Sequence, residues 1–420
     1  MAVVETTQTK TGRKALSLPF DMPLLLTVGA LLLFGLMMVY STTFDWAYVD
    51  YGNPAALFLR QLQWVALGLF LMFIVARLPY RLWQRLAVPL MLATIAALVL
   101  VLVLGASRFN AQRSFFGGSV QPSELAKFAT IVYLAVWLSS KGDKIRALGY
   151  GLIPFGIIVG ILAGLILLQP DLSAAVTIVV IATLMFFIAG ADMLQMGLVA
   201  VLGSGTVWVL FQLPISIAVT GRQRLADYLI GLQDLTQASW HVQMAASAFV
   251  NGGLFGRGLG AGHQKFGFLP TSHTDSIFAV IGEELGLFGC LMVIALFALL
   301  AWRGFRIAAR SRDPLGALLA AGIICWVVFE ALVNAAVMVG ALPFAGNALP
   351  FISYGGSNLV MVLIAMGVLL SISRRTEAEP LPRKSRFTGT LNAERGTQVH
   401  ATFDFSRRDG RRRLSRLSRR

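Results

Sequence analysis

The sequence predicts an all-α, polytopic membrane protein with about ten transmembrane helices and both termini in the cytoplasm. Of its 420 residues, 57% are hydrophobic and only 13% are charged, which excludes an ordinary soluble globule. Apolar runs of about twenty residues recur along the chain, and each is long enough to cross a hydrocarbon core of roughly 30 Å. Basic residues gather in the loops of one side, as the positive-inside rule requires.

The predicted spans follow one another with polar breaks between them. The first span lacks a small-residue cleavage site, so we expect a retained helix and not a removed signal peptide. The breaks at 169–171 and 190–192 are very short turns. The ten spans are about 22–40, 59–76, 86–104, 122–138, 150–168, 172–189, 192–212, 276–301, 316–339 and 354–373.

Three regions flank or interrupt the membrane domain 22–373. Residues 1–21 are expected to form a cytoplasmic tail, and about 213–275 form one large extracytoplasmic loop between spans seven and eight. Residues 374–420 form a basic tail without apolar periodicity, which predicts disorder. Its arginines favour attraction to anionic lipids of the inner leaflet, with docking to a cytoplasmic protein as the alternative. No aromatic pattern accompanies them, so we expect no nucleic-acid binding.

The net charge of +15 is explained by topology. Most of the 35 lysines and arginines lie in the tails and in the short loops assigned to the inner side. The two cysteines, Cys290 and Cys325, both lie in apolar runs and support neither a disulfide framework nor a metal cluster.

The candidate reaction centre is the segment 268–276, which opens the eighth span and places His273 and Asp275 where water meets the membrane. Titratable groups at such a boundary cost free energy and usually have a function. However, Ser272 and Asp275 also fit a capping box. Spacing alone therefore leaves Asp275 evenly divided between a helix cap and a catalytic carboxylate. His273 is either a polar contact to the substrate or a structural residue.

Two glutamates, Glu283 and Glu284, lie two turns inside the same predicted helix. At a rise of 1.5 Å per residue, Glu283 lies roughly 12 Å below Asp275, too far to share a proton with it. We therefore expect the glutamates to make hydrogen bonds between helices.

Cations and glycines mark the outer loops. The large loop carries Arg222 and Arg224, an amphipathic stretch at 240–249, and a glycine-rich run at 251–262 followed by Lys265. Glycines permit the close backbone approach that an anion-binding loop needs, although such a run can also be merely flexible. The neighbouring cations favour a ligand that bears phosphate.

A second polar group lies at the start of the fourth span, where Glu124 and Lys127 form an i,i+3 pair. This pair neutralises two embedded charges, lines a substrate groove, or does both. At the start of the last span, Ser353, Gly355 and Gly356 are small residues that permit tight helix packing and are expected to support the bundle.

Taken together, these segments resemble the SEDS family, the FtsW/RodA/SpoVE proteins of bacterial shape, division and sporulation. The resemblance covers nearly all of 20–373. It rests on five ordered motifs: Gln121-Pro122-Ser123-Glu124 with Lys127, Gln169-Pro170-Asp171-Leu172, the glycine segment 252–260, His273-Thr274-Asp275 with Gly282-Glu283-Glu284-Leu285-Gly286, and Pro350-Phe351-Ile352-Ser353-Tyr354-Gly355-Gly356-Ser357.

The resemblance implies a multi-pass peptidoglycan glycosyltransferase of the bacterial plasma membrane that polymerises lipid II into β-1,4 glycan strands. A class B penicillin-binding transpeptidase is the implied partner, and the family's essential aspartate aligns with Asp275. The long basic tail and the overall pattern favour the division-type FtsW over the elongation-type RodA. A septal location and contacts with other division-complex membrane proteins are then expected.

In such a polymerase the donor sugar leaves as a lipid pyrophosphate, so one carboxylate acting as general base suffices for inversion. Asp275 is the expected base. The expected pyrophosphate contacts, in descending order, are Arg222, Arg224, Lys265 and Arg113. A divalent cation such as Mg²⁺ or Mn²⁺ would also stabilise the leaving group, although the sequence shows no evident metal site.

Two other functions compete with this prediction. A lipid II flippase would bind its substrate near the bilayer midplane and alternate its access. The sequence shows no obvious inverted repeat, and its polar residues concentrate on the outer side. The other alternative is a catalytically silent scaffold of the division complex.

Overall fold

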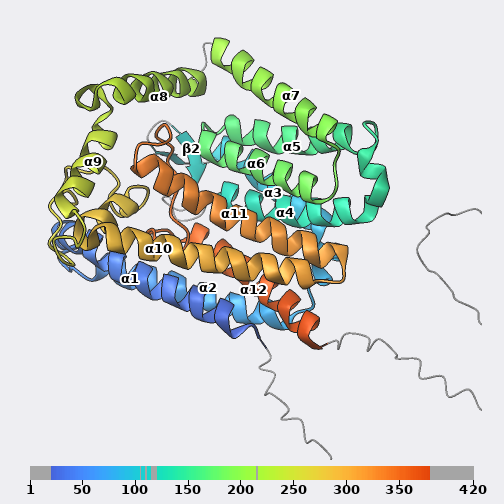
Figure 1. Cartoon of the computed structure of the whole chain (residues 1–420), viewed down its shortest axis with the longest axis horizontal. Coiled ribbons are helices and arrows are strands. Elements are labelled where there is room, and N and C mark those ends of the chain that lie inside the picture. Colours follow the sequence, from blue (N-terminus) through green and yellow to red (C-terminus); the bar gives the residue numbers. More distant parts are fainter. Residues whose placement is uncertain (1–19, 105, 109–110, 115–120, 214–215, 379–420) are drawn as a thin grey trace, which may run out of the picture. The chain divides into compact units, whose positions relative to one another are not determined.

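The computed structural model describes residues 20–104, 106–108, 111–114, 121–213 and 216–378. This part of the chain contains twelve α-helices, two short 3₁₀ segments and one two-stranded ribbon (Figure 1). The expectations for residues 1–19 and 379–420 of the two tails fall outside the described residues. The α-helices are α1 Met22–Tyr51, α2 Ala56–Arg77, α3 Leu82–Leu104, α4 Pro122–Lys141, α5 Leu152–Leu167, α6 Leu172–Ile188, α7 Met193–Gln212, α8 Ser216–Gln233, α9 Trp240–Gly252, α10 Ile277–Arg310, α11 Pro314–Met338 and α12 Ser357–Ala378.

Each of the ten predicted spans coincides with a helix, namely α1 to α7 and α10 to α12. Seven described helices are long and apolar enough to cross a membrane by length and composition. The helices α5 and α6 are apolar but shorter, with 16 and 17 residues. The helical prediction and the polytopic character of the chain are therefore confirmed.

Three features add to the predicted architecture. Helix α8 occupies part of the large outer loop, and the α9 helix covers the stretch expected to be amphipathic. An antiparallel ribbon joins β1 (Ala106–Arg108) to β2 (Ala111–Ser114). Helix α1 continues past residue 40 to Tyr51, where Gly52 ends it with a φ of 67°. A helix of 30 residues is about 45 Å long, so the end of α1 extends beyond a hydrocarbon core of roughly 30 Å.

The helix starts follow from local sequence. Asp21 caps α1 by accepting a hydrogen bond from the amide of Leu24, and Asp171 caps α6 in the same way. A capping box between Asp192 and Gln195 opens α7. Two short 3₁₀ segments complete the described elements. Segment η2 (Gly142–Arg146) follows α4, and η3 (Leu235–Gln237) lies between α8 and α9.

The helices pack in two neighbouring groups. Helix α12 lies against α2, which contacts α1, and α1 contacts α10. Helix α11 joins this group to α4 and α6, and its Trp326 is fully buried. Helix α7 differs, because Gln195 is its one buried residue among those described. Figure 1 shows α7 running along the edge of the helices next to α5 and α6.

Helix α10 is broken at Gly286, which has a φ of 67° and a ψ of −163°. The break frees backbone groups that an apolar bundle cannot leave unpaired. The carbonyls of Glu283 and Glu284 accept hydrogen bonds from the amides of Arg257 (3.0 Å) and Gly258 (2.9 Å). On the other side of the break, the amides of residues 287–288 donate to the carbonyls of residues 253–254, at 3.0 and 3.3 Å.

The glycine-rich run 252–262 therefore docks on the break in α10. The backbones approach so closely that a Cβ on Gly256 would overlap the carbonyl oxygen of Glu284. The amide of Gly260 is also engaged, by the carboxylate of Glu284 at 3.1 Å. These amides bind carbonyl and carboxylate groups of α10, and a phosphate contact of this loop stays a prediction.

We predict that Gly256→Ala destabilises the protein more than Gly260→Ala. Both glycines have a positive φ, 79° and 78°, so each alanine costs about 1 kcal/mol in backbone strain. A Cβ at Gly260 meets open space, whereas one at Gly256 would overlap Glu284 and add about 1–3 kcal/mol. Apparent melting temperatures in detergent measure the difference. Equal losses in the two variants would contradict the docking of this run on α10.

Candidate functional site

Asp275 lies in a turn, 271–276, immediately before α10. The N-cap position of the helix belongs to Ser276, whose hydroxyl donates to the carbonyl of Pro270 at 2.9 Å. Ser272 and Asp275 both precede this cap, so they do not form the capping box that the spacing allowed. Asp275 is half-buried at the outer end of the half-helix 277–285.

The backbone of residues 273–275 is held at three consecutive carbonyls. These accept hydrogen bonds, in order, from the amide of Tyr354 (2.8 Å), the hydroxyl of Ser353 (2.6 Å) and the side-chain amide of Asn334 (2.7 Å). The partners come from α11 and from the segment before α12. Asp275 is therefore mounted on a backbone whose position is set by two other parts of the bundle.

Sequence reasoning assigned no role to Asn334, although an amide inside an apolar span was the available signal. Besides Asp275, its Nδ2 also donates to the carbonyl of Asn347 at 2.6 Å. The adjacent Gly346 lies against the catalytic candidate, because a Cβ built on it would be 3.0 Å from Oδ2 of Asp275. The hydroxyl of Ser173 on α6 donates to the carbonyl of Gly346 at 3.3 Å. The segment 341–353 thus borders the Asp275 carboxylate.

His273 belongs to an aromatic group beside this turn. Its ring lies 5.1 Å from that of Trp46 on α1 and 5.8 Å from that of Tyr354, between ring centroids. Trp46 is exposed, while His273 is half-buried. The structure gives His273 packing partners, and its contact with a substrate stays a prediction.

Of the two arginines on α8, Arg224 reaches the segment that borders Asp275. Its Nη1 donates to the carbonyl of Phe344 at 3.4 Å, and its guanidinium lies 5.5 Å from the centre of the Phe344 ring. Phe344 is two residues from Gly346, so Arg224 contacts the same loop that approaches the Asp275 carboxylate. Arg222 is exposed on a different face of the helix, because residues at i and i+2 do not face the same way.

The cation at this point is Arg224 and not the neighbouring imidazole. His241 stacks on Phe344, with ring centroids 4.3 Å apart. Burial lowers the pKa of His241, and the positive charge of Arg224 lowers it further. His241 is therefore neutral at neutral pH, which leaves the guanidinium as the charged group on the Phe344 ring.

Lys265 was expected to contact pyrophosphate, which stays a prediction, and the structure shows other partners for its ammonium. Its ammonium is buried and donates to Glu284 (2.7 Å), to the hydroxyl of Ser41 (3.1 Å) and to the carbonyl of Gly260 (2.9 Å). An ammonium has three N–H donors, and these contacts occupy them. Lys265 therefore serves as the counterion of a buried carboxylate.

The two glutamates of the half-helix bind the chain around them. Glu283 accepts hydrogen bonds from the amides of His263 (2.9 Å) and Gln264 (3.1 Å). Glu284 accepts from the hydroxyl of Ser41, which ties α10 to α1. Both carboxylates are fully buried. The structure thus places them where the expected hydrogen bonds between elements form.

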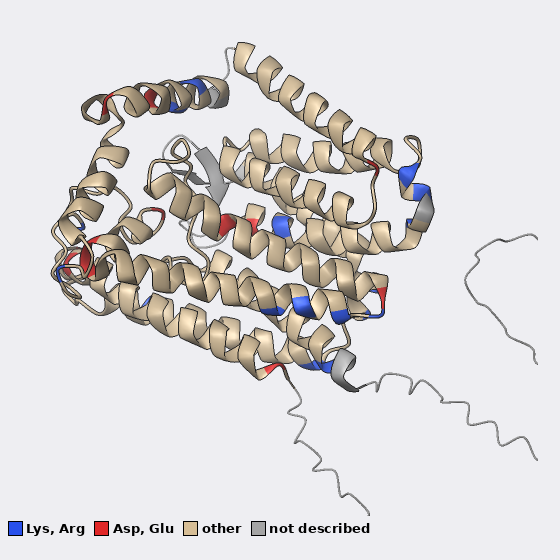
Figure 2. Ribbon diagram, in the orientation of Figure 1, with Lys and Arg blue, Asp and Glu red and all other residues tan. Residues whose placement is uncertain are grey.

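The pair Glu124 and Lys127 is part of a larger buried group. The ammonium of Lys127 lies 2.7 Å from Glu124 and also contacts the carboxylate of Glu330 on α11. The side chain of Asn358 on α12 donates to Glu124 at 2.9 Å. Three helices therefore meet at this ion group. Figure 2 shows that most of the helical ribbon carries no charged residue, with charged positions mainly near helix ends.

The remaining predicted residues have the following places. The amide of Gly355 donates to Gln61 on α2 at 3.2 Å, and a Cβ on Gly356 would lie 2.7 Å from the Trp64 ring. Gly356 thus lets the start of α12 approach α2 closely, and the backbone amide of Gly355 joins the two. Arg113 lies in β2, and its side chain falls outside the described residues.

A divalent cation held by protein ligands alone does not fit the described residues. Among them, no group of three or more His, Cys, Asp and Glu side chains could hold a metal ion. The geometry instead offers a positioned carboxylate, a glycine that approaches it closely, and a guanidinium on α8 that contacts the same loop. This combination suits proton abstraction next to an anionic group.

Comparison with known proteins agrees with this site. The family model described as "Cell cycle protein", FtsW/RodA/SpoVE, matches residues 22–378. A probable peptidoglycan glycosyltransferase FtsW of Trichlorobacter lovleyi is 41% identical over 87% of this chain and 96% of its own length. Stage V sporulation protein E of Bacillus subtilis is 37% identical over 84% of this chain and 97% of its own.

Solved structures give the same result. A chain of a peptidoglycan synthase complex matches with a TM-score of 0.69 at 28% identity, over 86% of this chain and 99% of that chain. RodA of Thermus thermophilus matches with a TM-score of 0.62 at 26% identity, over 87% and 99% of the two chains. The family match spans every helix described above, including those that carry Asp275, Asn334 and Ser353. This chain belongs to the FtsW/RodA/SpoVE family of cell cycle proteins.

Proposed function

We propose that this chain is a peptidoglycan glycosyltransferase that polymerises lipid II, with Asp275 as its general base. The observation that carries the proposal is the position of Asp275: hydrogen bonds to three consecutive carbonyls hold its backbone, and Gly346, which has no Cβ, allows its loop to approach the carboxylate closely. Relatives that are 36–41% identical and named probable peptidoglycan glycosyltransferases support the reaction class.

In the proposed reaction, the hydroxyl of the acceptor sugar attacks the anomeric carbon of the donor. The carbon–oxygen bond to the pyrophosphate breaks, and its electron pair stays on the pyrophosphate oxygen. Asp275 takes the proton of the attacking hydroxyl, a step that typically contributes 10²–10⁴-fold to the rate. The pyrophosphate is already a good leaving group, so no second carboxylate is needed as an acid.

Arg224 is the proposed pyrophosphate contact. Charge that develops on the leaving group is stabilised best by donors already in place. The Phe344 carbonyl and ring hold the guanidinium on the loop that borders Asp275. Arg222 on the same helix and Arg113 on β2 stay further candidates, as does Lys265, whose ammonium already neutralises Glu284.

The wider setting of the enzyme follows from the same reading. The described apolar helices make the chain a multi-pass membrane protein. We propose ten spans, cytoplasmic termini, a septal location and a class B penicillin-binding transpeptidase as partner. The similarity to a chain of a peptidoglycan synthase complex supports such a partner. The other division-complex proteins and the lipid contacts of the basic tail are proposed on the sequence alone.

We predict that Asp275→Asn lowers the rate of glycan polymerisation at least 10²-fold. The substitution keeps the shape of the side chain but removes the base. Polymer is measured with purified protein, lipid II and the partner transpeptidase. Asp234→Asn changes the partly exposed carboxylate that caps η3 and is expected to leave the rate unchanged. An unchanged amount of polymer from the Asp275 variant would contradict the assignment of Asp275 as the base. Translocation of lipid II without polymer would favour a flippase.

We also predict that Arg224→Gln and Lys265→Met fail in different ways. Loss of a hydrogen bond to a charged group should lower kcat/KM of the Arg224 variant about 10- to 100-fold at an unchanged melting temperature. Gln223→Ala, at an exposed position of the same helix α8, is the control for Arg224→Gln.

Lys265→Met leaves Glu284 buried without its counterion, which costs about 3–5 kcal/mol and lowers the melting temperature. A stable Lys265 variant with a selective loss of kcat/KM would support Lys265 as a substrate contact.

A further inference from the structure

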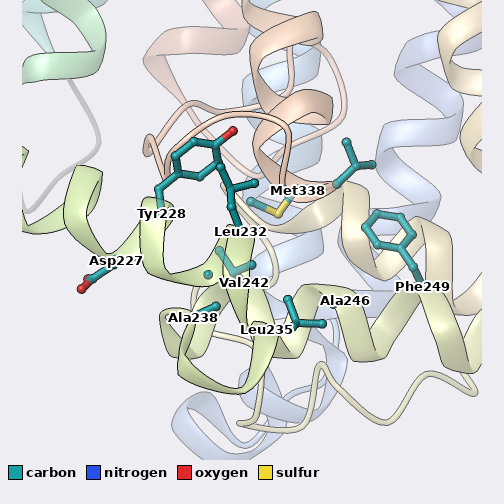
Figure 3. A pocket seen from close by; sticks show the side chains of 12 residues that line it. Asp227, Tyr228, Leu232, Leu235, Ala238, Val242, Ala246, Phe249 and Met338 are labelled. Carbon is teal, nitrogen blue, oxygen red and sulfur yellow. The ribbon is translucent and has the colours of Figure 1, made fainter.

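A cavity of about 150 Å³ lies between α8, α9 and the end of α11 (Figure 3). Apolar side chains make up most of its lining, among them Leu232, Val242, Phe249 and Met338. A cavity of this volume lined by such residues holds a group about the size of benzene. The space therefore suits five or six carbon atoms of an apolar ligand.

The cavity and Arg224 lie along one face of α8. Tyr228 lines the cavity, and its hydroxyl donates to the carbonyl of Ala341 at 2.9 Å. Arg224 precedes Tyr228 by four residues, so both lie on the same helix face about one turn, or 5.4 Å, apart. From Ala341 the chain continues to Phe344, which Arg224 contacts, and to Gly346, which borders Asp275.

A second connection runs through α9. Phe249 lines the cavity, and its ring packs so closely on α10 that a Cβ on Gly282 would overlap it. Gly282 belongs to the half-helix that begins just after Asp275. The cavity, the Arg224 guanidinium and the Asp275 carboxylate thus follow one another around a single loop and a single half-helix.

We infer that this cavity holds the isoprene unit next to the pyrophosphate of a polyprenyl-linked sugar. The inference rests on the proposed function and names a subsite for it. In such a donor the order of groups is branched apolar chain, pyrophosphate and sugar. The protein presents an apolar cavity, a guanidinium and a carboxylate in the same order. A branched five-carbon unit also matches the volume of the cavity.

The orientation of the charged residue Asp227 at the edge of the cavity is compatible with an anionic ligand group beside Arg224. Asp227 lies at the edge of the lining, and Figure 3 shows its side chain extending away from Tyr228 and Leu232. An anionic group beside Arg224 therefore does not face the Asp227 carboxylate across the cavity. An ordinary acyl chain would fill the same apolar space but would make no use of the neighbouring guanidinium.

The test compares three probes on the full-length protein: geranyl pyrophosphate, geraniol and inorganic pyrophosphate. Thermal stabilisation in lipid nanodiscs reports their binding. We expect geranyl pyrophosphate to bind at least 10-fold more tightly than either fragment. Equal binding of geraniol would show that the cavity takes any apolar chain, and equal binding of inorganic pyrophosphate would show that the cavity is not used. Either outcome overturns the inference.

The matched variants are Ala246→Leu, which fills the cavity, and Ala226→Leu, which adds the same atoms at an exposed position of α8. We expect the first to weaken geranyl pyrophosphate binding at least 10-fold without changing that of inorganic pyrophosphate, and the second to change neither. If Ala246→Leu lowers the melting temperature of the free protein, Val242→Ala, which enlarges the cavity, replaces it with the same expected direction. Wild-type affinity in a folded cavity variant contradicts the inference.

Binding and catalysis separate this inference from the proposed function. A protein that binds geranyl pyrophosphate through the cavity but makes no glycan would refute the polymerase proposal alone. A polymerase whose KM for lipid II is unchanged by Ala246→Leu would refute the cavity assignment alone. The expected result is a KM raised about 10-fold at an unchanged kcat.

Discussion

The backbone groups freed at the break in α10 must find hydrogen-bond partners inside an apolar bundle. The packing of the glycine-rich run on α10 depends on that constraint. Water does not reach such groups in the hydrocarbon region, so another part of the chain has to supply the hydrogen bonds. The run 253–258 does so on both sides of Gly286. Backbone groups of the glycines that were expected to suit an anion are therefore hydrogen-bonded to α10. The break also makes the half-helix 277–285 a separate element, and Asp275 lies just before its N-terminal end.

Embedded charges obey the same logic. Lys265 neutralises Glu284, and Lys127 lies between two carboxylates from different helices. At the opposite end of α10, Arg303 pairs with Asp21 at 2.6 Å and ties the helix to α1. A buried charge without a partner is strongly destabilising, so these groups serve first to join helices. Asp275 and Arg224, the two charged residues proposed to act on the substrate, are instead only half-buried.

Much of the fold could be predicted because it depends on local composition. Long apolar runs determine spans, and all ten predicted spans coincide with helices. Helix α8 was missed because its apolar residues alternate with Arg222, Arg224 and Asp227, which gives no membrane signal. The role of Lys265 could not be predicted, since a lysine beside glycines looks the same whether its partner is a phosphate or a carboxylate. Only the tertiary contact with Glu284 distinguishes the two.

The site depends on contacts between segments that are distant in the chain. Asn334 holds the carbonyl of Asp275 and that of Asn347 with one side-chain amide. The adjacent Gly346 then borders the carboxylate, and Phe344 holds Arg224. The proposed base and the proposed pyrophosphate contact are therefore linked through one amide and one short loop. The same loop begins at the apolar cavity. A donor bound there would therefore contact the cavity, Arg224 and Asp275, which this loop connects, and these three contacts would position its reacting carbon.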